Sequence, residues 1–429
     1  MVVSSMSTPE FGHQCVSEKR LRDDISRTAE FGAIETDRGH GRTVLTGTEA
    51  NRKAREYFVE RLEAAGLDVR VDAVGNIAGR WVPDGADSTA APVACGSHLD
   101  SVPEGGIFDG VLGVYSGLEA VRALQRADAD LERPIDVVCF TEEEGARFSN
   151  GVLGSSVASG RQTVEDALAR EDTDGVTVEM ALSDIGFRGS GHLDASRWDS
   201  WLELHVEQGE RLQDANAAVG IVSAITGTIR CAVEIEGEAN HSGSTTMAER
   251  TDALTAASEL ILEVENATEA VVADHGDTVV GTVGKLDVSP NAINVVPGRV
   301  ELGIDIRDVR YESMERIIDR VTDRLARLET DRGVETTFER PYDIAPSEMS
   351  ERCISGLERA AETVGVPSLS LHSGAGHDTM HVATVTDTGM LFAPSHGGFS
   401  HSPREWTDWS SCATATQVLA AGLEGLAGD

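Results

Sequence analysis

The stretch GSHLDSVPEGGIFDGVLG, residues 96–113, follows the apolar run APVAC and contains a His-x-Asp pair, His98 and Asp100. The alternation of a strand puts residues i and i+2 on the same side, so both side chains can serve one site. The glycines that follow let the backbone turn back and bring a second carboxylate, Asp109, close to them. Polar ligands just past the carboxyl end of a buried strand are typical of sites in α/β proteins. Taken alone, the stretch favours the simpler interpretation of a surface turn with an incidental histidine and two acids.

The length of 429 residues predicts two domains, because a single core rarely grows that large. Apolar residues make up 40% of the chain, which is enough to fold without disulfides. The six cysteines are scattered without CxxC pairs, so we expect reduced, mostly buried thiols in a cytoplasmic protein. We expect neither a membrane span nor a secretory leader, since no apolar run approaches 18 residues and no basic segment precedes one.

The charge balance is strongly acidic, with 73 acids against 36 bases and a formal net charge of −37. The acids are spread along the chain. This argues against nucleic-acid binding, which needs a basic surface, and against anionic membranes. An acidic surface poor in lysine predicts a salt-rich, halophilic cell interior, where screening weakens self-repulsion.

The order of the expected elements predicts an α/β catalytic domain interrupted by an insertion. Strands and helices alternate up to residue 217 and again from 342 to 429, as in a catalytic domain in two parts. Residues 218–341 read as an inserted α+β sandwich with Val- and Ile-rich strands. Within it we expect helices over 248–268 and 312–328, the second with apolar residues at the 3-and-4 spacing of one buried face.

Four separate segments carry residue types that bind metal ions. Two divalent ions need one shared carboxylate and about two further ligands each. Nitrogen and oxygen ligands without thiolate suit zinc, and also manganese, cobalt or nickel. The residues that satisfy this count are His98, Asp109, Glu144, His205 and His401.

Seven ordered motifs, which cover nearly the whole chain from about Val16 onward, resemble the di-metal amidase/hydantoinase/carbamoylase family. They are GSHLDSVPEGGIFDGVLG, TEEEGARF, ELHVEQG, HSGSTTMAERTDAL, PNAINVVPGRVELGIDIRD, SGAGHD and GGFSHSPREWT. This family includes N-carbamoyl-L-amino-acid hydrolases, allantoate amidohydrolases and β-ureidopropionases, within the aminoacylase–carboxypeptidase superfamily. The resemblance implies an aminopeptidase-like di-metal catalytic domain with an inserted lid and dimerisation domain.

By position, the resemblance makes Asp109 the ligand that bridges two divalent ions per subunit. His98 and His205 would complete one ion, and Glu144 and His401 the other. Asp100 would orient His98, and Glu143 would be the general base. Because Glu142 makes the acid run a triple one, a shift by one residue would exchange the roles of base and ligand. His396, five residues before His401, is the rival for the last position.

The resemblance also implies the residues that contact substrate. Histidine at position 205, in the ELHVEQG context, indicates the linear-amidase branch, whereas peptidase relatives usually have a carboxylate there. His241 in the insertion would polarise the scissile carbonyl and stabilise its oxyanion. The residues expected to hold or line the substrate are Gln208, Asn294, Arg307 and His377, with Asp378 beside the last. Glu203 and Glu207 have no assigned role.

The activity implied by the resemblance is hydrolysis of an N-carbamoyl-L-amino acid to the amino acid, CO2 and ammonia. Allantoate is the second candidate among small ureido or amidino carboxylates, and an aminoacylase or dipeptidase is a rival enzyme. A non-catalytic metal or metabolite binder is the rival from another class, although it would not need Glu143. In the family the inserted domain mediates a homodimer, and its residues can reach the partner subunit's site.

Overall fold

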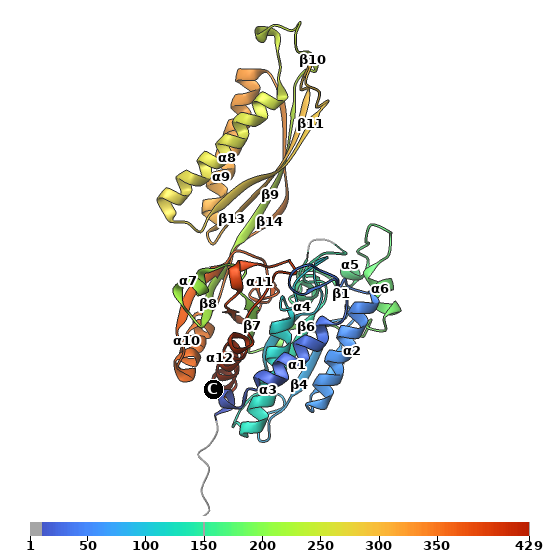
Figure 1. Ribbon diagram of the computed structural model, residues 1–429, viewed down its shortest axis with the longest axis vertical. Coiled ribbons are helices and arrows are strands. Elements are labelled where there is room, and N and C mark those ends of the chain that lie inside the picture. The colour runs from blue at the N-terminus through green and yellow to red at the C-terminus, as the bar shows by residue number, and fades with distance from the viewer. Residues whose placement is uncertain (1–10, 149–150, 429) are drawn as a thin grey trace, which may run out of the picture. The chain divides into compact units, whose positions relative to one another are not determined.

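The computed structural model describes residues 11–148 and 151–428, so residues 1–10, 149–150 and 429 of the expected catalytic domain lie outside the described residues. The chain forms two compact units (Figure 1). The second unit comprises Ala224–Glu348 and His372–Ala375, and the rest of the described chain belongs to the first. Within the described part of the chain, no helix is long and apolar enough to cross a membrane.

The first unit is built on a mixed sheet with the strand order β8-β17-β7-β5-β6-β4-β3, and β16 also pairs with β8. The strands are β3 (Asp68–Val71), β4 (Ile77–Trp81), β5 (Val93–His98), β6 (Ile135–Phe140), β7 (Ser200–Val206), β8 (Val219–Ile225), β16 (Ser368–Ser373) and β17 (Asp387–Ala393). Four of them, β6, β5, β7 and β17, are mutually parallel neighbours. Their carboxyl ends therefore meet at one edge of the sheet, which is where the metal-type residues of the sequence are concentrated.

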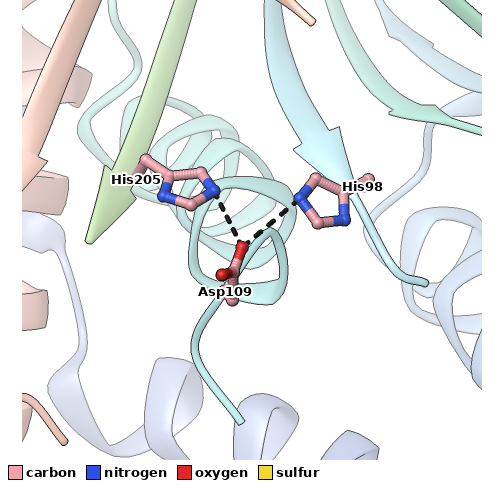
Figure 2. A group of neighbouring side chains, drawn as sticks. All are labelled: His98, Asp109 and His205. Carbon is pink, nitrogen blue, oxygen red and sulfur yellow. Dashed lines mark ion pairs between the residues drawn. The ribbon is translucent and has the colours of Figure 1, made fainter. Parts of the chain in front are cut away.

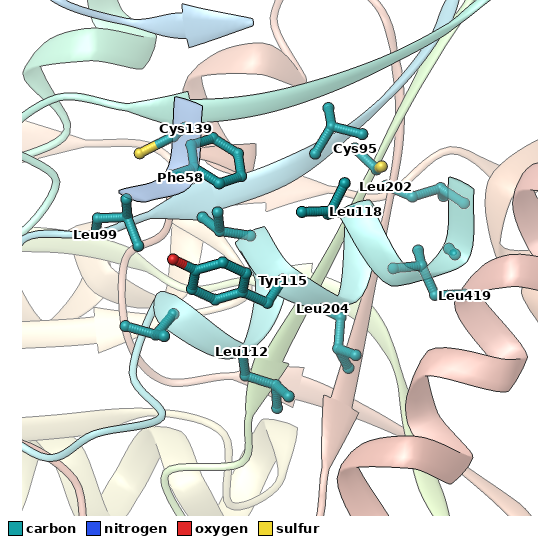
Figure 3. Close-up of a cluster of buried hydrophobic side chains, with 14 of the residues drawn as sticks. Phe58, Cys95, Leu99, Leu112, Tyr115, Leu118, Cys139, Leu202, Leu204 and Leu419 are labelled. Carbon is teal, nitrogen blue, oxygen red and sulfur yellow. The ribbon is translucent and has the colours of Figure 1, made fainter. Parts of the chain in front are cut away.

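The long helices of the unit cover one face of this sheet and smaller elements cover the other, because the parallel strands are buried on both sides. The main helices of the unit are α1 (Glu18–Ala29), α2 (Glu49–Ala64), α3 (Val111–Ala127), α10 (Glu351–Val364) and α12 (Trp409–Ala427). Tyr115 and Leu118 of α3 pack among Phe58 of α2 and Cys95 of β5 (Figure 3). The opposite face carries a smaller aromatic cluster, in which the rings of Trp198 and Trp201 stack with centroids 5.3 Å apart. All six cysteines are buried and free, as expected.

The second unit is an antiparallel sheet with the strand order β11-β13-β9-β14 and two long helices. The elements are β9 (Gly227–Glu236), α8 (Ala253–His275), β11 (Val280–Ser289), β13 (Arg299–Asp308), α9 (Tyr311–Arg332) and β14 (Glu335–Ile344). Figure 1 shows α8 and α9 side by side along this sheet. The predicted apolar stripe of α9 is buried against the strands, from Met314 to Leu328.

The helix expected over 248–268 begins later, at Ala253, and extends to His275. Thr246 and Glu249 instead close a capping box on a 3-10 turn. Asp252 then caps α8, because its carboxylate accepts the backbone N–H groups of Leu254 and Thr255, each at 3.0 Å. The helix start predicted from the sequence was thus wrong by five residues, and the local caps explain the difference.

Short elements complete the two units. They are β1 (Ala33–Ile34), β2 (Gly41–Arg42), α4 (Leu153–Ala158), α5 (Val164–Leu168), α6 (Val178–Asp184), α7 (Arg211–Ala215), β10 (Asn240–His241), β12 (Val295–Val296), β15 (Ser347–Glu348) and α11 (Thr379–Val382).

Candidate metal centre

Three buried side chains meet at the carboxyl edge of the sheet (Figure 2). His98 ends β5, His205 lies near the end of β7, and Asp109 precedes α3. Oδ1 of Asp109 lies 3.1 Å from Nε2 of His205 and 3.5 Å from Nε2 of His98. The loop between His98 and Asp109 thus brings Asp109 back to the end of β5.

The ring contacts of the two histidines fix which nitrogen faces Asp109 without a proton. Nδ1 of His98 lies 3.1 Å from the backbone oxygen of Asp100, and Nδ1 of His205 lies 3.2 Å from that of Val206. A carbonyl only accepts, so the neutral rings carry their protons on Nδ1. Two Nε2 lone pairs and a carboxylate oxygen then converge, and the Gly110 N–H makes a long hydrogen bond, at 3.3 Å, to one of them, Nε2 of His205. Such a set of acceptors calls for a cation.

The second oxygen of Asp109 faces a further pair of ligand-type residues. Oδ2 of Asp109 lies 3.6 Å from Nε2 of His401, which in turn lies 3.3 Å from Oε2 of Glu144. The possible ligand atoms of these three residues all lie within 4.8 Å of one another. Asp109 therefore stands between two donor groups, which is the arrangement of a bridging carboxylate.

Gly110 is required by this arrangement. Its φ is +67°, a value that L side chains rarely adopt. A Cβ at this position would also lie 2.4 Å from Cε1 of His98, which is closer than any real contact. The Phe-Asp-Gly sequence lets α3 begin directly against the histidine ring.

The three adjacent glutamates of the acid run point in three different directions. The Glu142 carboxylate accepts the backbone N–H groups of Arg147 and Phe148, at 2.9 and 2.8 Å, and so closes the turn. Glu143 faces His98, with 3.5 Å between Oε2 and Nε2, and Glu144 faces His401. Glu143 therefore approaches the His98 side of Asp109, and Glu144 approaches the His401 side.

Asp100 supports two of these segments at once. Its carboxylate accepts the backbone N–H groups of Glu143 and Glu144, at 3.3 and 3.1 Å, which holds their turn against β5. Its Oδ1 lies 3.7 Å from Nδ1 of His98, farther away than its own backbone oxygen. The short contact that orients His98 is thus to the backbone of Asp100, whereas the carboxylate orients the neighbouring turn.

The electrostatics of the cluster favour a bound cation. Burial, opposed by His98 and reinforced by Glu144, raises the pKa of Glu143 well above its ordinary value. Burial and the charge of Asp109 raise the pKa of Glu144 to about 8. Burial lowers the pKa of His98, but the carboxylates of Glu143, Asp109 and Asp100 outweigh it and raise that pKa well above its usual range. These shifts report carboxylates crowded together without sufficient positive charge.

The unpaired atoms in the cluster also match metal ligation. Nε2 of His98 and Oε1 of Glu144 are buried and have no hydrogen-bond partner among the described residues. A buried polar atom without a partner costs about 1–3 kcal/mol, so it needs an explanation. The nitrogen and oxygen donors fit zinc, manganese, cobalt or nickel, and the described cluster contains no thiolate that would restrict the choice.

Gln208 and His377 also lie at this edge. The Gln208 amide donates to Oδ2 of Asp109 at 3.3 Å. His377 is buried with its ring 4.6 Å from that of His205, and burial lowers its pKa well below the ordinary value. Asp378 is completely buried at the start of α11.

Two buried glutamates that the sequence left without a role hold this edge together. Glu203 accepts hydrogen bonds from the Ser97 hydroxyl at 2.7 Å and the Thr379 hydroxyl at 2.6 Å, which ties β5, β7 and α11. Glu207 accepts from the backbone of Arg211 and Leu212 at the start of α7. Only the spacing of Glu203 from His205, two residues along a strand, could have signalled a shared face.

His241 and Asn294 lie together in the second unit. The short strands β10 and β12 pair His241 with Val295, and the backbone oxygen of Asn294 accepts from Ser242 at 3.0 Å. Both side chains are exposed. The structure thus places these two predicted substrate residues beside each other, at the short antiparallel pair formed by β10 and β12.

Arg307 lies at the other end of the same unit. It pairs with Thr228 of β9, whereas Arg299, eight residues earlier on β13, pairs with Glu236 at the end next to β10 and β12. Eight residues of extended strand span about 26 Å at roughly 3.3 Å each. Arg307 and the end of the sheet next to His241 are therefore separated by about that length.

The profile of Peptidase family M20/M25/M40 matches residues 94–424, from β5 to α12. The chain belongs to this family. The match spans every segment that carries a residue of the candidate metal centre, together with the whole second unit.

Two relatives that the chain resembles are named for the reactions that they catalyse. The chain is 38% identical over 397 residues to an N-carbamoyl-L-amino acid amidohydrolase of Geobacillus stearothermophilus, covering 92% of this chain and 95% of the relative. It is 33% identical to an allantoate amidohydrolase of Bacillus subtilis, covering 90% and 92%. A crystal structure of an amidase of the hydantoinase/carbamoylase family from Burkholderia multivorans superposes with a TM-score of 0.88 at 34% identity, covering 96% and 98%.

Proposed function

We propose that the protein is a metal-dependent amidohydrolase that cleaves linear C–N bonds in N-carbamoyl-L-amino acids, giving the amino acid, CO2 and ammonia. The observation that carries the proposal is Asp109, placed between two sets of donors with Glu143 beside them. The similarity to the Geobacillus stearothermophilus enzyme supports the choice of substrate.

Two divalent ions per subunit would be held by five residues of the first unit. His98 and His205 would bind one, Glu144 and His401 the other, and Asp109 both. When bound, such ions supply Lewis-acid activation of a carbonyl and of a water molecule. The residues themselves do not favour one of zinc, manganese, cobalt and nickel.

Glu143 would move the proton in the reaction. Its side chain is nearly buried, at 9% exposure, and burial raises its pKa, which suits a carboxylate that keeps the proton taken from water until it passes it on. It takes a proton from the attacking water and gives it to the nitrogen that leaves. Asp100 keeps this carboxylate in place by accepting from the Glu143 backbone.

His241 would donate to the scissile carbonyl oxygen. Its Nδ1 accepts the backbone N–H groups of Gly243 and Ser244, at 3.0 and 3.2 Å, so a neutral ring carries its proton on Nε2. That N–H is then available to an oxyanion, which is the stabilising contact that acyl transfer needs. Asn294, its neighbour across β10 and β12, would add a second polar group.

Arg307 would bind the substrate carboxylate. Asp305 accepts from Nε at 2.8 Å and the Gly374 backbone oxygen from Nη1 at 3.0 Å, which fixes the guanidinium plane and leaves other N–H groups for a ligand. Gln208 would contact the ureido or carboxylate end, and His377 would line the pocket.

We infer that the site is completed across a homodimer. Arg307 lies about 26 Å along β13 from Arg299, at the end of the strand next to His241, so Arg307 and His241 can serve one substrate only if they come from different subunits. The inserted domain, residues 218–341, would be the lid and dimerisation domain between the two parts of the catalytic domain. Exposed apolar side chains on it, including Leu286 of the edge strand β11 and Leu262 of α8, suit such an interface.

Allantoate is the second candidate substrate, because it is also a linear ureido carboxylate and the Bacillus subtilis relative is named for it. An ammonia-release assay in concentrated KCl on N-carbamoyl-L-amino acids and on allantoate separates the two. It is run with added Mn, Co, Ni or Zn and with a chelator. Cleavage of N-acetyl amino acids or dipeptides without ammonia from carbamoyl substrates would contradict the proposal and favour an aminoacylase or dipeptidase.

The net charge of −37 supports the proposal that the protein functions in a salt-rich cytoplasm. At that charge, the compact state gains from screening of its own repulsion. The assay above therefore needs high salt to test the folded enzyme.

A further inference from the structure

Glu405 is a buried carboxylate that binds the backbone of the bridging ligand. Its Oε1 accepts the N–H groups of both Phe108, at 2.8 Å, and Asp109, at 3.1 Å. The residue is 1% exposed, and its Oε2 has no hydrogen-bond partner among the described residues. One oxygen atom of Glu405 thus accepts both hydrogen bonds, and Glu405 and Asp109 are 296 positions apart in the sequence.

Glu405 also belongs to the segment that carries His401. Its own N–H donates to the backbone oxygen of Ser402 at 3.0 Å, which closes a turn just after the histidine. His401 is half exposed, at 53%, with a φ of +52°, so its position depends on the backbone on either side of it. The hydroxyl of Ser400 reaches Oδ2 of Asp109 at 2.9 Å from the other side.

The loop that contains Asp109 leaves room for this carboxylate at Gly106. A Cβ on Gly106 would lie 2.2 Å from Oε1 of Glu405. The buried guanidinium of Arg42 holds the same loop by donating to the backbone oxygens of Gly106, at 3.3 Å, and Leu99, at 3.1 Å. The loop is thus shaped around the Glu405 side chain.

We propose that Glu405 is a positioning residue. Its Oε1 fixes the separation between the loop that carries Asp109 and the segment that carries His401. This separation sets the affinity with which Asp109, Glu144 and His401 bind the ion that they share. The inference rests on the proposed two-ion site. It concerns an acceptor oxygen held against two backbone N–H groups, so a neutral amide oxygen at the same place should serve as well as a carboxylate.

The test is cobalt binding to the full-length protein in concentrated KCl, for wild type, E405A, E405Q and E119A. Glu119 is the control for loss of a buried glutamate: it also accepts a backbone N–H, from Ser17 at 2.7 Å, and pairs with Arg20 at 2.7 Å, but it lies on α3 away from the ligand segments. The readouts are equivalents of Co2+ bound at equilibrium, affinity by competition with a chelator, and the visible absorption of the bound Co2+.

We expect wild type, E405Q and E119A to bind two Co2+ per subunit with the same spectrum. E405A should bind the second equivalent about 10–100-fold more weakly, the usual cost of losing a group that orients a ligand, with an altered spectrum. Two equivalents bound by E405A with wild-type affinity and spectrum would overturn the inference, as would the same loss in E405Q. If wild type itself binds fewer than two ions, the proposed two-ion function is what fails.

A second route avoids any folding defect of E405A. In G106A the added methyl group displaces Oε1 while Glu405 remains present. G106A alone should weaken the second equivalent by a similar factor, and adding G106A to E405Q should weaken it likewise. The double variant G106A/E405A should lose less than the sum of the two single losses, because the Oε1 contact is already gone and only the clash of the new methyl group with Cβ of residue 405, at 2.6 Å, remains. Strictly additive losses in G106A and E405A would contradict the proposal.

Discussion

Replacing Glu143 with glutamine removes the proposed base and leaves most of its surroundings intact. The side chain is 9% exposed, and its close contact is the 3.5 Å approach of Oε2 to His98. The hydrogen bond that anchors this residue runs from its backbone N–H to Asp100 at 3.3 Å, and it survives the substitution. Glutamine has the same shape but cannot take up a proton at neutral pH, so the effect should fall on the chemical step.

The expected loss in kcat is about 10²- to 10⁴-fold, or about 2.7–5.4 kcal/mol of transition-state stabilisation. KM and the number of bound ions should stay within a few-fold of wild type. The assay is ammonia release from an N-carbamoyl-L-amino acid, with metal content measured on the same samples. E144Q, one residue along, should instead lose metal, because Glu144 faces His401. A fall in kcat of less than tenfold in metal-loaded E143Q would refute the assignment of the base.

Three further predictions concern metal, pH and salt. H401A should bind one ion fewer than wild type, whereas H396A should keep both ions. The reason is that His396 is exposed and pairs with Asp408 at 3.2 Å. Metal loss in H396A alone would reverse the assignment of the ligand. In metal-free protein the pKa of Glu144 is raised from 4.5 to about 8, so the folded state binds more protons than the unfolded state. The stability of the folded state should therefore fall as the pH rises from 5 to 8. The melting temperature should drop less over this range in E144Q, and equal drops in E144Q and wild type would contradict this prediction. The net charge of −37 predicts a melting temperature that rises as the KCl concentration increases from 0.1 M to above 1 M. Over this range the Debye length falls from about 10 Å to about 3 Å, which screens the repulsion between the acids. A melting temperature that stays flat or falls would contradict the halophilic interpretation.

The carboxyl edge of the sheet was predictable because its strands are short, continuous apolar runs that end in polar residues. The run IDVVCF is buried throughout, and its neighbour ends at His98. Parallel pairing then brings the ends together without further information from the sequence. The other four metal-type residues come within a few ångströms of Asp109 for this reason.

Other features depend on contacts between distant segments. Strand β17, Asp387–Ala393, gives little signal alone, and pairing Phe392 with His205 places it in the sheet. Glu405 sits in a polar segment, and its bond to Asp109 is visible only after folding. The separation of Arg307 from His241 likewise follows from the length of the β9–β13 ladder, which no motif reveals.

The central claim is that the protein hydrolyses N-carbamoyl-L-amino acids with two bound metal ions per subunit. It is tested most directly by measuring product formation as a function of the number of metal ions bound. Metal-free protein in concentrated KCl is titrated with Mn, Co, Ni or Zn while ammonia and free amino acid released from an N-carbamoyl-L-amino acid are measured. The account predicts both products in equal amounts, with full activity reached at two ions per subunit. Equal activity in the chelated protein, or no ammonia with two ions bound, would contradict it.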